Sequence, residues 1–150
     1  MSAGNSTERT AQLDKAERDQ LEDVVIDLRE KVEEEIEYEL EHHYELTERE
    51  GGENLSEEEQ DTRERLVEAI DYEGDEDHSW QWRYQQYISG VGYTIVNRLA
   101  AFRCMEVRGF LDRPVTQLGE SGLTPAAERI LGERFALGRD EAIIAAYHDE

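Results

Sequence analysis

The sequence predicts an all-α fold that consists of a helical domain with a long acidic N-terminal helix and a central apolar helix. Apolar residues recur at steps of three and four along most of the chain, as they do on one face of a helix. Residues that favour helix ends lie between the apolar runs. No strand-like alternation of useful length and no internal repeat is present. Helices therefore account for the predicted secondary structure.

The first predicted helix carries one apolar stripe and is packed with glutamate on its other faces. We expect residues 1–12 to be disordered and residues 13–150 to form a single α-helical domain. Gly51 and Gly52 are expected to end this helix, since glycine is common directly after helices. The stripe consists of Leu21, Val25, Leu28, Val32, Ile36, Leu40 and Tyr44.

Capping signals mark the remaining predicted helices. Ser56 opens the second helix, and Glu59 three residues later completes a capping box. The third is expected to run from near Asp77 or Ser79 to Arg108, with Gly109 after its end. Thr124 followed by Pro125 predicts another start, and the pattern RDEAIIAAYHDE predicts a last helix.

The charge of the chain is extreme and uneven. The chain holds 38 acids and 16 bases, for a formal net charge of -22, and only Lys15 and Lys31 among the bases are lysine. This composition favours adaptation to concentrated salt over an acidic disordered tail, because the apolar residues keep a helical period. Residues 79–118 carry 2 acids and 5 bases and form the one positive zone. That zone is where we expect function to lie.

No catalytic, cofactor-binding or metal site is predicted. The two prolines, Pro114 and Pro125, are not adjacent, so the N-P-P-[YFW] loop of an amino-methyltransferase is missing from the sequence. His42 and His43 are neighbours on a helix and point about 100° apart, which disfavours a shared metal ion. Cys104 has no histidine partner at motif spacing and is expected to be a buried small hydrophobe.

The helix expected over residues 79–108 has a wide apolar surface, which predicts a central core element packed on most sides. Glu106 falls inside the apolar arc with Arg103 beside it, so we expect the two charges to form a structural pair. A narrower polar face holds Asn97, Arg98 and Arg108, with Arg113 beyond the helix. The narrow apolar arc consists of Ile88, Ile95, Leu99 and Phe102, and it is widened by Tyr93, Val96, Ala100, Cys104 and Val107.

The segment VGYTIVNRLAAFRCMEVRGFLDRPVTQ resembles a family. It is similar to the N-terminal helical region of the PglX-type adenine-specific DNA methyltransferases of BREX phage-defence systems, and to the related type IIG restriction-modification methylases. The family pattern N-R-[LI]-x-A-[LIF]-R-x-M-E-V-x-G-[FYL]-[LI] is matched from Asn97 to Leu111, and an aromatic residue, Tyr93, precedes it. The match is tight over about 20 residues, and the acidic opening helix looks like that of haloarchaeal members.

The resemblance implies a part of a methyltransferase. Family members have a Rossmann-like core and a target-recognition region after this one, so we expect an N-terminal fragment or a split gene product that does not methylate alone. The full-length family implies S-adenosylmethionine as cofactor, and DNA and the methyltransferase core as partners, with possible protein partners of a defence complex. If this region touches DNA, the possible contacts are Asn97, Arg98, Arg108 and Arg113, because arginine suits phosphate. Whether to call this chain an enzyme is therefore left open.

Two alternatives stand beside the methyltransferase fragment. One is a free-standing acidic halophilic helical module that binds a protein partner. The other is a DNA mimic, which is disfavoured because salt adaptation already explains the carboxylates. The polar N-terminus indicates neither a signal peptide nor a membrane span, so we expect a cytoplasmic protein.

Overall fold

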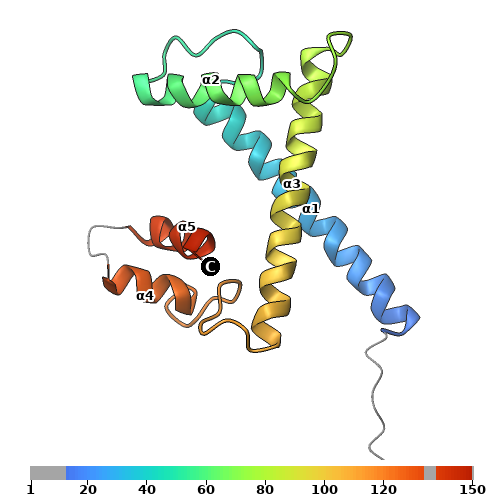
Figure 1. Ribbon diagram of the computed structural model, residues 1–150, viewed down its shortest axis with the longest axis vertical. Helices are drawn as coiled ribbons and strands as arrows, with labels where there is room; N and C mark the ends of the chain where they lie inside the picture. The colour runs from blue at the N-terminus through green and yellow to red at the C-terminus, as the bar shows by residue number, and fades with distance from the viewer. Residues whose placement is uncertain (1–12, 134–137, 150) are drawn as a thin grey trace, which may run out of the picture. The chain divides into compact units, whose positions relative to one another are not determined.

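The structure is a computed structural model that describes residues 13–133 and 138–149. These residues form five α-helices and no strand, so the fold is all-α, as predicted (Figure 1). The predicted disordered segment 1–12 lies outside the described residues. The helices are α1 (Lys15–Tyr44), α2 (Glu57–Asp71), α3 (Trp80–Val107), α4 (Pro125–Glu133) and α5 (Arg139–Asp149).

The chain divides into two compact units, and the division falls within α3. Unit 1 extends to Gly92 and holds α1, α2 and the first part of α3. Unit 2 begins at Tyr93 and holds the rest of α3, α4 and α5. The single domain predicted over residues 13–150 stays a prediction, and each unit is described by itself.

Helix α1 ends at Tyr44, earlier than the break expected at Gly51 and Gly52. Glu45 adopts the left-handed conformation with φ 50°, and the backbone N–H of Leu46 donates to the carbonyl of Leu40 at 3.0 Å. Leu46 is fully buried. Burial of this leucine therefore fixes a turn that the glycine signal does not reveal.

A buried arginine of α2 holds the end of α1 in place. The guanidinium of Arg63 donates to four backbone carbonyl oxygens at and after the last residue of α1, at 2.9–3.3 Å. Only the first of them belongs to the helix end, where the dipole is negative and a cation is favourable, and the others lie in the turn that follows. The loop passes close to the arginine at Gly52, where an added Cβ would lie 2.6 Å from Arg63 Cδ. The acceptors are the carbonyls of Tyr44, Glu45, Glu48 and Arg49.

Unit 1 has its own hydrophobic core around the C-terminal part of α1. Leu40, Ile70, Tyr84 and Ile88 are buried together with Leu46. Figure 1 shows α2 lying across the C-terminal end of α1. The first part of α3 passes close to α1 at Gly92, where an added Cβ would lie 2.8 Å from Glu33 Cγ. Glycine at position 92 thus allows a close contact between the two helices.

Ion pairs join the ends of the helices in unit 1. Asp71, at the end of α2, accepts from Arg49 Nη2 at 2.9 Å and from Arg83 Nη1 at 3.3 Å. The hydrogen bond from Arg49 is the main reason that the pKa of Asp71 lies below its ordinary value, although partial burial opposes it. One carboxylate therefore links the end of α2 to the loop before α2 and to the start of α3.

In unit 2, helix α3 ends as the sequence predicts. Gly109 has φ 69°, and the N–H groups of Gly109 and Phe110 donate to the carbonyls of Glu106 and Met105. This pair of hydrogen bonds forms a Schellman motif, in which glycine adopts the left-handed conformation at no steric cost. Helix α4 begins at Pro125, and Thr124 Oγ1 accepts from the N–H of Ala127 at 3.2 Å.

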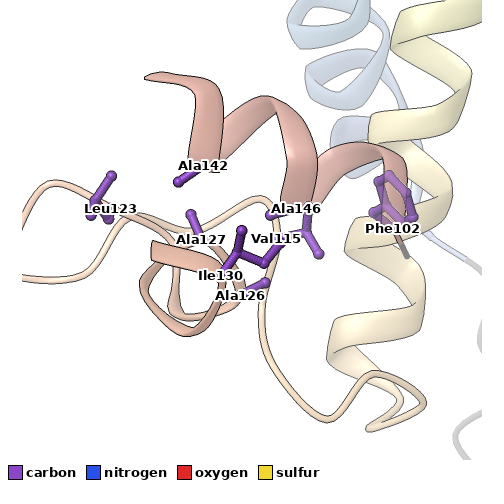
Figure 2. Close-up of a cluster of buried hydrophobic side chains, with 8 residues drawn as sticks. All are labelled: Phe102, Val115, Leu123, Ala126, Ala127, Ile130, Ala142 and Ala146. Atoms are coloured by element: carbon purple, nitrogen blue, oxygen red, sulfur yellow. The ribbon is translucent and has the colours of Figure 1, made fainter. Parts of the chain in front are cut away.

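The core of unit 2 consists largely of small side chains, which allow α4 and α5 to approach closely. Figure 2 shows Ala127 and Ile130 of α4 facing Ala142 and Ala146 of α5, with Phe102 of α3 at one end of the cluster. Val115 and Leu123 come from the loop between α3 and α4. This arrangement places the resemblance-bearing part of α3 against the C-terminal helices.

Candidate interaction site on helix α3

The part of α3 that carries the family pattern packs one of its sides within unit 2. Phe102 is buried, and its ring meets the edge of Tyr147 in α5 with 5.5 Å between ring centroids. Ile95 and Leu99 are half-buried. The narrow apolar arc predicted from the sequence is therefore the side of α3 that packs within the chain.

Arg98, one of the predicted DNA contacts, is engaged inside unit 2. Its Nη2 donates to the carbonyl of Tyr147 at 3.0 Å, and its guanidinium lies 4.5 Å from the centre of the Tyr147 ring. The same guanidinium lies 5.4 Å from the centre of the Phe102 ring. Arg98 thus fastens α5 to α3 by a hydrogen bond and by cation–π contact.

The other three predicted DNA contacts are exposed. Asn97 and Arg108 are exposed on α3, and Arg113 is exposed in the loop that follows. Within residues 13–133 and 138–149, none of the three side chains has a partner, which leaves their donors directed to solvent. The structure therefore separates the predicted set into one arginine that holds unit 2 together and three side chains that are open to a ligand.

Arg103 and Glu106 are brought together, but they differ sharply in burial. Arg103 Nη1 lies 3.2 Å from Glu106 Oε2, where the arginine side chain is 49% exposed and the glutamate side chain is 3% exposed. The predicted pair is therefore formed, but only Glu106 is a buried charge. A half-exposed arginine loses little solvation, so its share of the pair is small.

Glu106 holds the loop after α3, a role that the sequence does not reveal. Its Oε1 accepts from the N–H groups of Val115 and Thr116 at 2.6 and 2.7 Å, and its Oε2 accepts from Thr116 Oγ1 at 2.5 Å. Burial by itself would raise the pKa of this carboxyl. The hydrogen bonds from Thr116, Val115 and Arg103 outweigh burial, and the pKa lies below its ordinary value.

Much of the remaining side of α3 is open, although Val96 is buried, and this corrects the prediction of a helix packed on most sides. Tyr93 is 61% exposed and Val107 is 71% exposed, and Ala100 and Cys104 are exposed between them. The expectation that Cys104 is buried is therefore wrong. At 100° per residue, these four positions lie within about 60° of one another and form a single stripe. Periodicity predicts such an apolar face but does not say what covers it. We refer to Tyr93, Ala100, Cys104 and Val107 as the open face of α3.

Neither a metal centre nor a membrane segment is found in the part of the chain that the structure describes. Within residues 13–133 and 138–149, no three side chains among His, Cys, Asp and Glu are grouped so that they could hold an ion. His42 instead stacks on Tyr38, with 4.0 Å between ring centroids, and its Nδ1 lies 3.0 Å from the Tyr38 carbonyl oxygen. No described helix has an apolar stretch long enough to cross a bilayer.

Comparison with known proteins gives no relative. No protein-family model, no curated protein and no solved structure matches the chain. The methyltransferase resemblance therefore stays a prediction that rests on the motif between Tyr93 and Leu111.

Proposed function

We propose that this chain is the N-terminal helical region of an adenine-specific DNA methyltransferase of a phage-defence or restriction-modification system. It acts as a structural platform for the catalytic core and has no catalytic role alone. The open face of α3 carries this proposal, since it lies within the motif that resembles the family. An uncharged, exposed stripe on a helix is typical of a surface that another protein covers.

The composition of the open face suits a protein partner better than it suits DNA. Tyr93 supplies an aromatic anchor at one end, and Val107 supplies an aliphatic one at the other. Ala100 and Cys104 are small, so a partner helix can approach the backbone of α3 between these anchors. Phe110, which is 69% exposed just beyond the helix, extends the apolar surface. We therefore assign the open face to the methyltransferase core.

Contact with DNA, in this proposal, comes from the rim of the same surface. Asn97, Arg108 and Arg113 have donors directed to solvent, and arginine matches the geometry of phosphate oxygens. Such contacts position a duplex without reading its bases. Arg98 is not part of this set, because its guanidinium already donates to the carbonyl of Tyr147. In the proposed assembly S-adenosylmethionine is held by the core, and the protein works in the cytoplasm.

The experiment is reconstitution with the polypeptide encoded after Glu150, which we expect to carry an N-P-P-Y motif. The chain should co-purify with that core, and methylation of adenine in DNA should require the core and not occur with the chain alone. Ala100→Glu should abolish co-purification, because it places a charge in the centre of the open face. Glu64→Gln, an exposed change on α2, is the control and should leave binding intact.

Three outcomes would contradict the proposal. One is a following reading frame without methyltransferase motifs, together with no binding to any such core. Another is complex formation that survives Ala100→Glu, which would place the interface elsewhere. The third is methyl transfer by the chain alone. Binding to an unrelated protein through the same face would favour the alternative of a free-standing interaction module.

A further inference from the structure

The N-terminal half of α1 carries an apolar stripe that nothing in the described chain covers. Leu21, Val25 and Leu28 are 51%, 41% and 36% exposed, and Val32 at the end of the stripe is half-buried. The stripe continues into the buried core of unit 1 only from Ile36 onward. Half of the longest helix therefore presents apolar side chains to solvent.

The spacing of this stripe is that of a two-stranded coiled coil. Leu21, Val25, Leu28 and Val32 follow one another at steps of four, three and four. The two leucines then occupy d positions of a heptad repeat, and the two valines occupy a positions. Two such heptads are marginal as isolated helices, but α1 is already held as a helix by unit 1 and by a capping box at Asp14.

The N-terminal half of α1 is much less acidic than the rest of the helix, so a second copy can bind there with less charge repulsion. Residues 15–32 hold 6 acids and 4 bases, a net charge of -2, and include both lysines of the chain. Residues 33–45 hold 7 acids and no base, a net charge of -7. Association through residues 15–32 therefore brings together the least acidic part of α1.

The flanking charges favour an antiparallel second copy. When Leu21 faces Val32 of the other copy and Val25 faces Leu28, Glu22 lies beside Arg29 of the other copy. At each end of the four apolar layers, Arg18 of one copy then lies opposite Glu35 of the other. The two-fold symmetry of the dimer repeats both the Glu22–Arg29 pair and the Arg18–Glu35 pair.

The parallel arrangement has the opposite charge pattern. It would place Arg18 opposite Arg18, Glu35 opposite Glu35, and Glu17 beside Glu22 of the other copy. It would also set the two strongly acidic 33–45 segments side by side, where the antiparallel arrangement directs them to opposite ends. Like charges at these positions are destabilising.

We infer that the N-terminal half of α1 is a homodimerisation surface, on which two copies of this chain pair as a short antiparallel coiled coil. This surface is separate from the open face of α3, and it does not depend on the proposed methyltransferase function. Four apolar layers make a small interface, so we expect a dissociation constant on the order of tens of micromolar at molar salt, where the net charge of -22 is screened.

Sedimentation equilibrium of the whole chain in 3 M KCl, from about 5 to 500 µM, tests this inference. The wild type should pass from monomer to dimer across that range. Val25→Glu should weaken the dimer at least tenfold, because a carboxylate enters a central layer. Ile26→Glu is the matched control: Ile26 is 47% exposed and adjacent in sequence, but it lies about 100° around the helix and should leave dimerisation unchanged.

Charge reversal tests the orientation of the two helices, and it is measured at about 0.5 M KCl, where neighbouring charges are only partly screened. Glu22→Arg should weaken the antiparallel dimer by placing it against Arg29, and adding Arg29→Glu should restore it. Circular dichroism of each variant verifies that α1 stays helical, since Arg29 also pairs with Glu33 within the helix at 2.7 Å. A chain that stays monomeric to 500 µM, a dimer that Ile26→Glu disrupts as much as Val25→Glu does, or a dimer that Glu22→Arg strengthens would overturn the inference.

Discussion

Replacing Glu106 with glutamine is expected to loosen the loop between α3 and α4 and to destabilise unit 2. The carboxylate accepts three hydrogen bonds from Val115 and Thr116 and one from Arg103. Its side chain is 3% exposed, so solvent does not replace these bonds. Each of these hydrogen bonds therefore contributes to the stability of unit 2.

The magnitude follows from the atoms that change. Glutamine keeps one oxygen for the two backbone N–H groups but loses the charge that strengthens those bonds, and it offers an NH2 group where Arg103 needs an acceptor. Since a hydrogen bond to a charged group contributes about 1.5–3 kcal/mol, we expect Glu106→Gln to lower the free energy of unfolding by about 2 kcal/mol. Glu106→Ala leaves two buried N–H groups without an acceptor and should lower it by about 4 kcal/mol.

The same carboxyl predicts a pH dependence. Its pKa is lower in the folded protein than its ordinary value of 4.5, so its contribution to stability is complete above that value. The contribution is lost as pH falls through the folded pKa, because protonation removes the negative charge that strengthens these hydrogen bonds. The difference in stability between the wild type and Glu106→Gln should therefore shrink as pH is lowered from 7 towards 3.

The assay has to separate the two units. Both tryptophans, Trp80 and Trp82, belong to unit 1, so their fluorescence reports on unit 1 during urea unfolding, while amide hydrogen exchange at Val115 and Thr116 reports on the loop. Glu106→Gln should speed exchange at both amides and leave the tryptophan transition in place. Glu120→Gln, which removes one exposed charge from the same unit, is the control. Equal stability of the two variants, or free exchange of both amides in the wild type, would mean that Glu106 does not hold the loop.

Four further outcomes are expected. Arg103→Met should cost less than about 1 kcal/mol because the side chain is half exposed, and a double-mutant cycle with Glu106→Gln should give a small coupling; losses of 3 kcal/mol would contradict this. Arg63→Met should lower the urea midpoint of the tryptophan transition by the equivalent of about 3 kcal/mol, since four carbonyls lose their donor, and an unchanged midpoint would mean that water replaces the guanidinium. Helicity and melting temperature by circular dichroism should be higher in 3 M KCl than in 0.1 M KCl, because salt screens the repulsion among 38 carboxylates, and equal values would count against salt adaptation. In the complex with the core, Arg108→Gln with Arg113→Gln should weaken binding to all DNA sequences alike and flatten its salt dependence, and unchanged affinity would remove DNA from the proposal.

The sequence predicts those parts of the fold that depend on local signals. The Ser56–Glu59 capping box, the left-handed Gly109 and the Thr124 cap are each formed within a few residues, and each is found where it is expected. The last helix likewise follows from its own apolar period. Such interactions depend on neighbours in the sequence, which is why they can be predicted from it.

Features that depend on distant residues could not be predicted. The end of α1 is set by Leu46 and by Arg63, which lies 14–19 positions beyond its four carbonyl acceptors. Glu106 is an acidic residue in an apolar arc, but its main donors are mostly backbone N–H groups, which leave no mark in the sequence.

The candidate site shows the same limit. Arg98 reads as a free cation on a polar face, yet it binds a carbonyl 49 positions away. The width of the apolar surface on α3 was evident from periodicity, but periodicity gives no information on whether the surface packs within the chain. The open face is therefore a finding of the structure and could not be inferred from the pattern.

In the proposed function a methyltransferase core binds the open face of α3, and Cys104 offers the most direct test. It is the one cysteine in the sequence, and it is exposed in the middle of that face. Its rate of modification by a maleimide should be measured with and without the N-P-P-Y polypeptide at saturating concentration. We predict at least tenfold slower labelling in the complex, and no slowing when the chain carries Ala100→Glu. Unchanged labelling of Cys104 in a demonstrated complex would contradict the account, because the core would then be bound to some other surface.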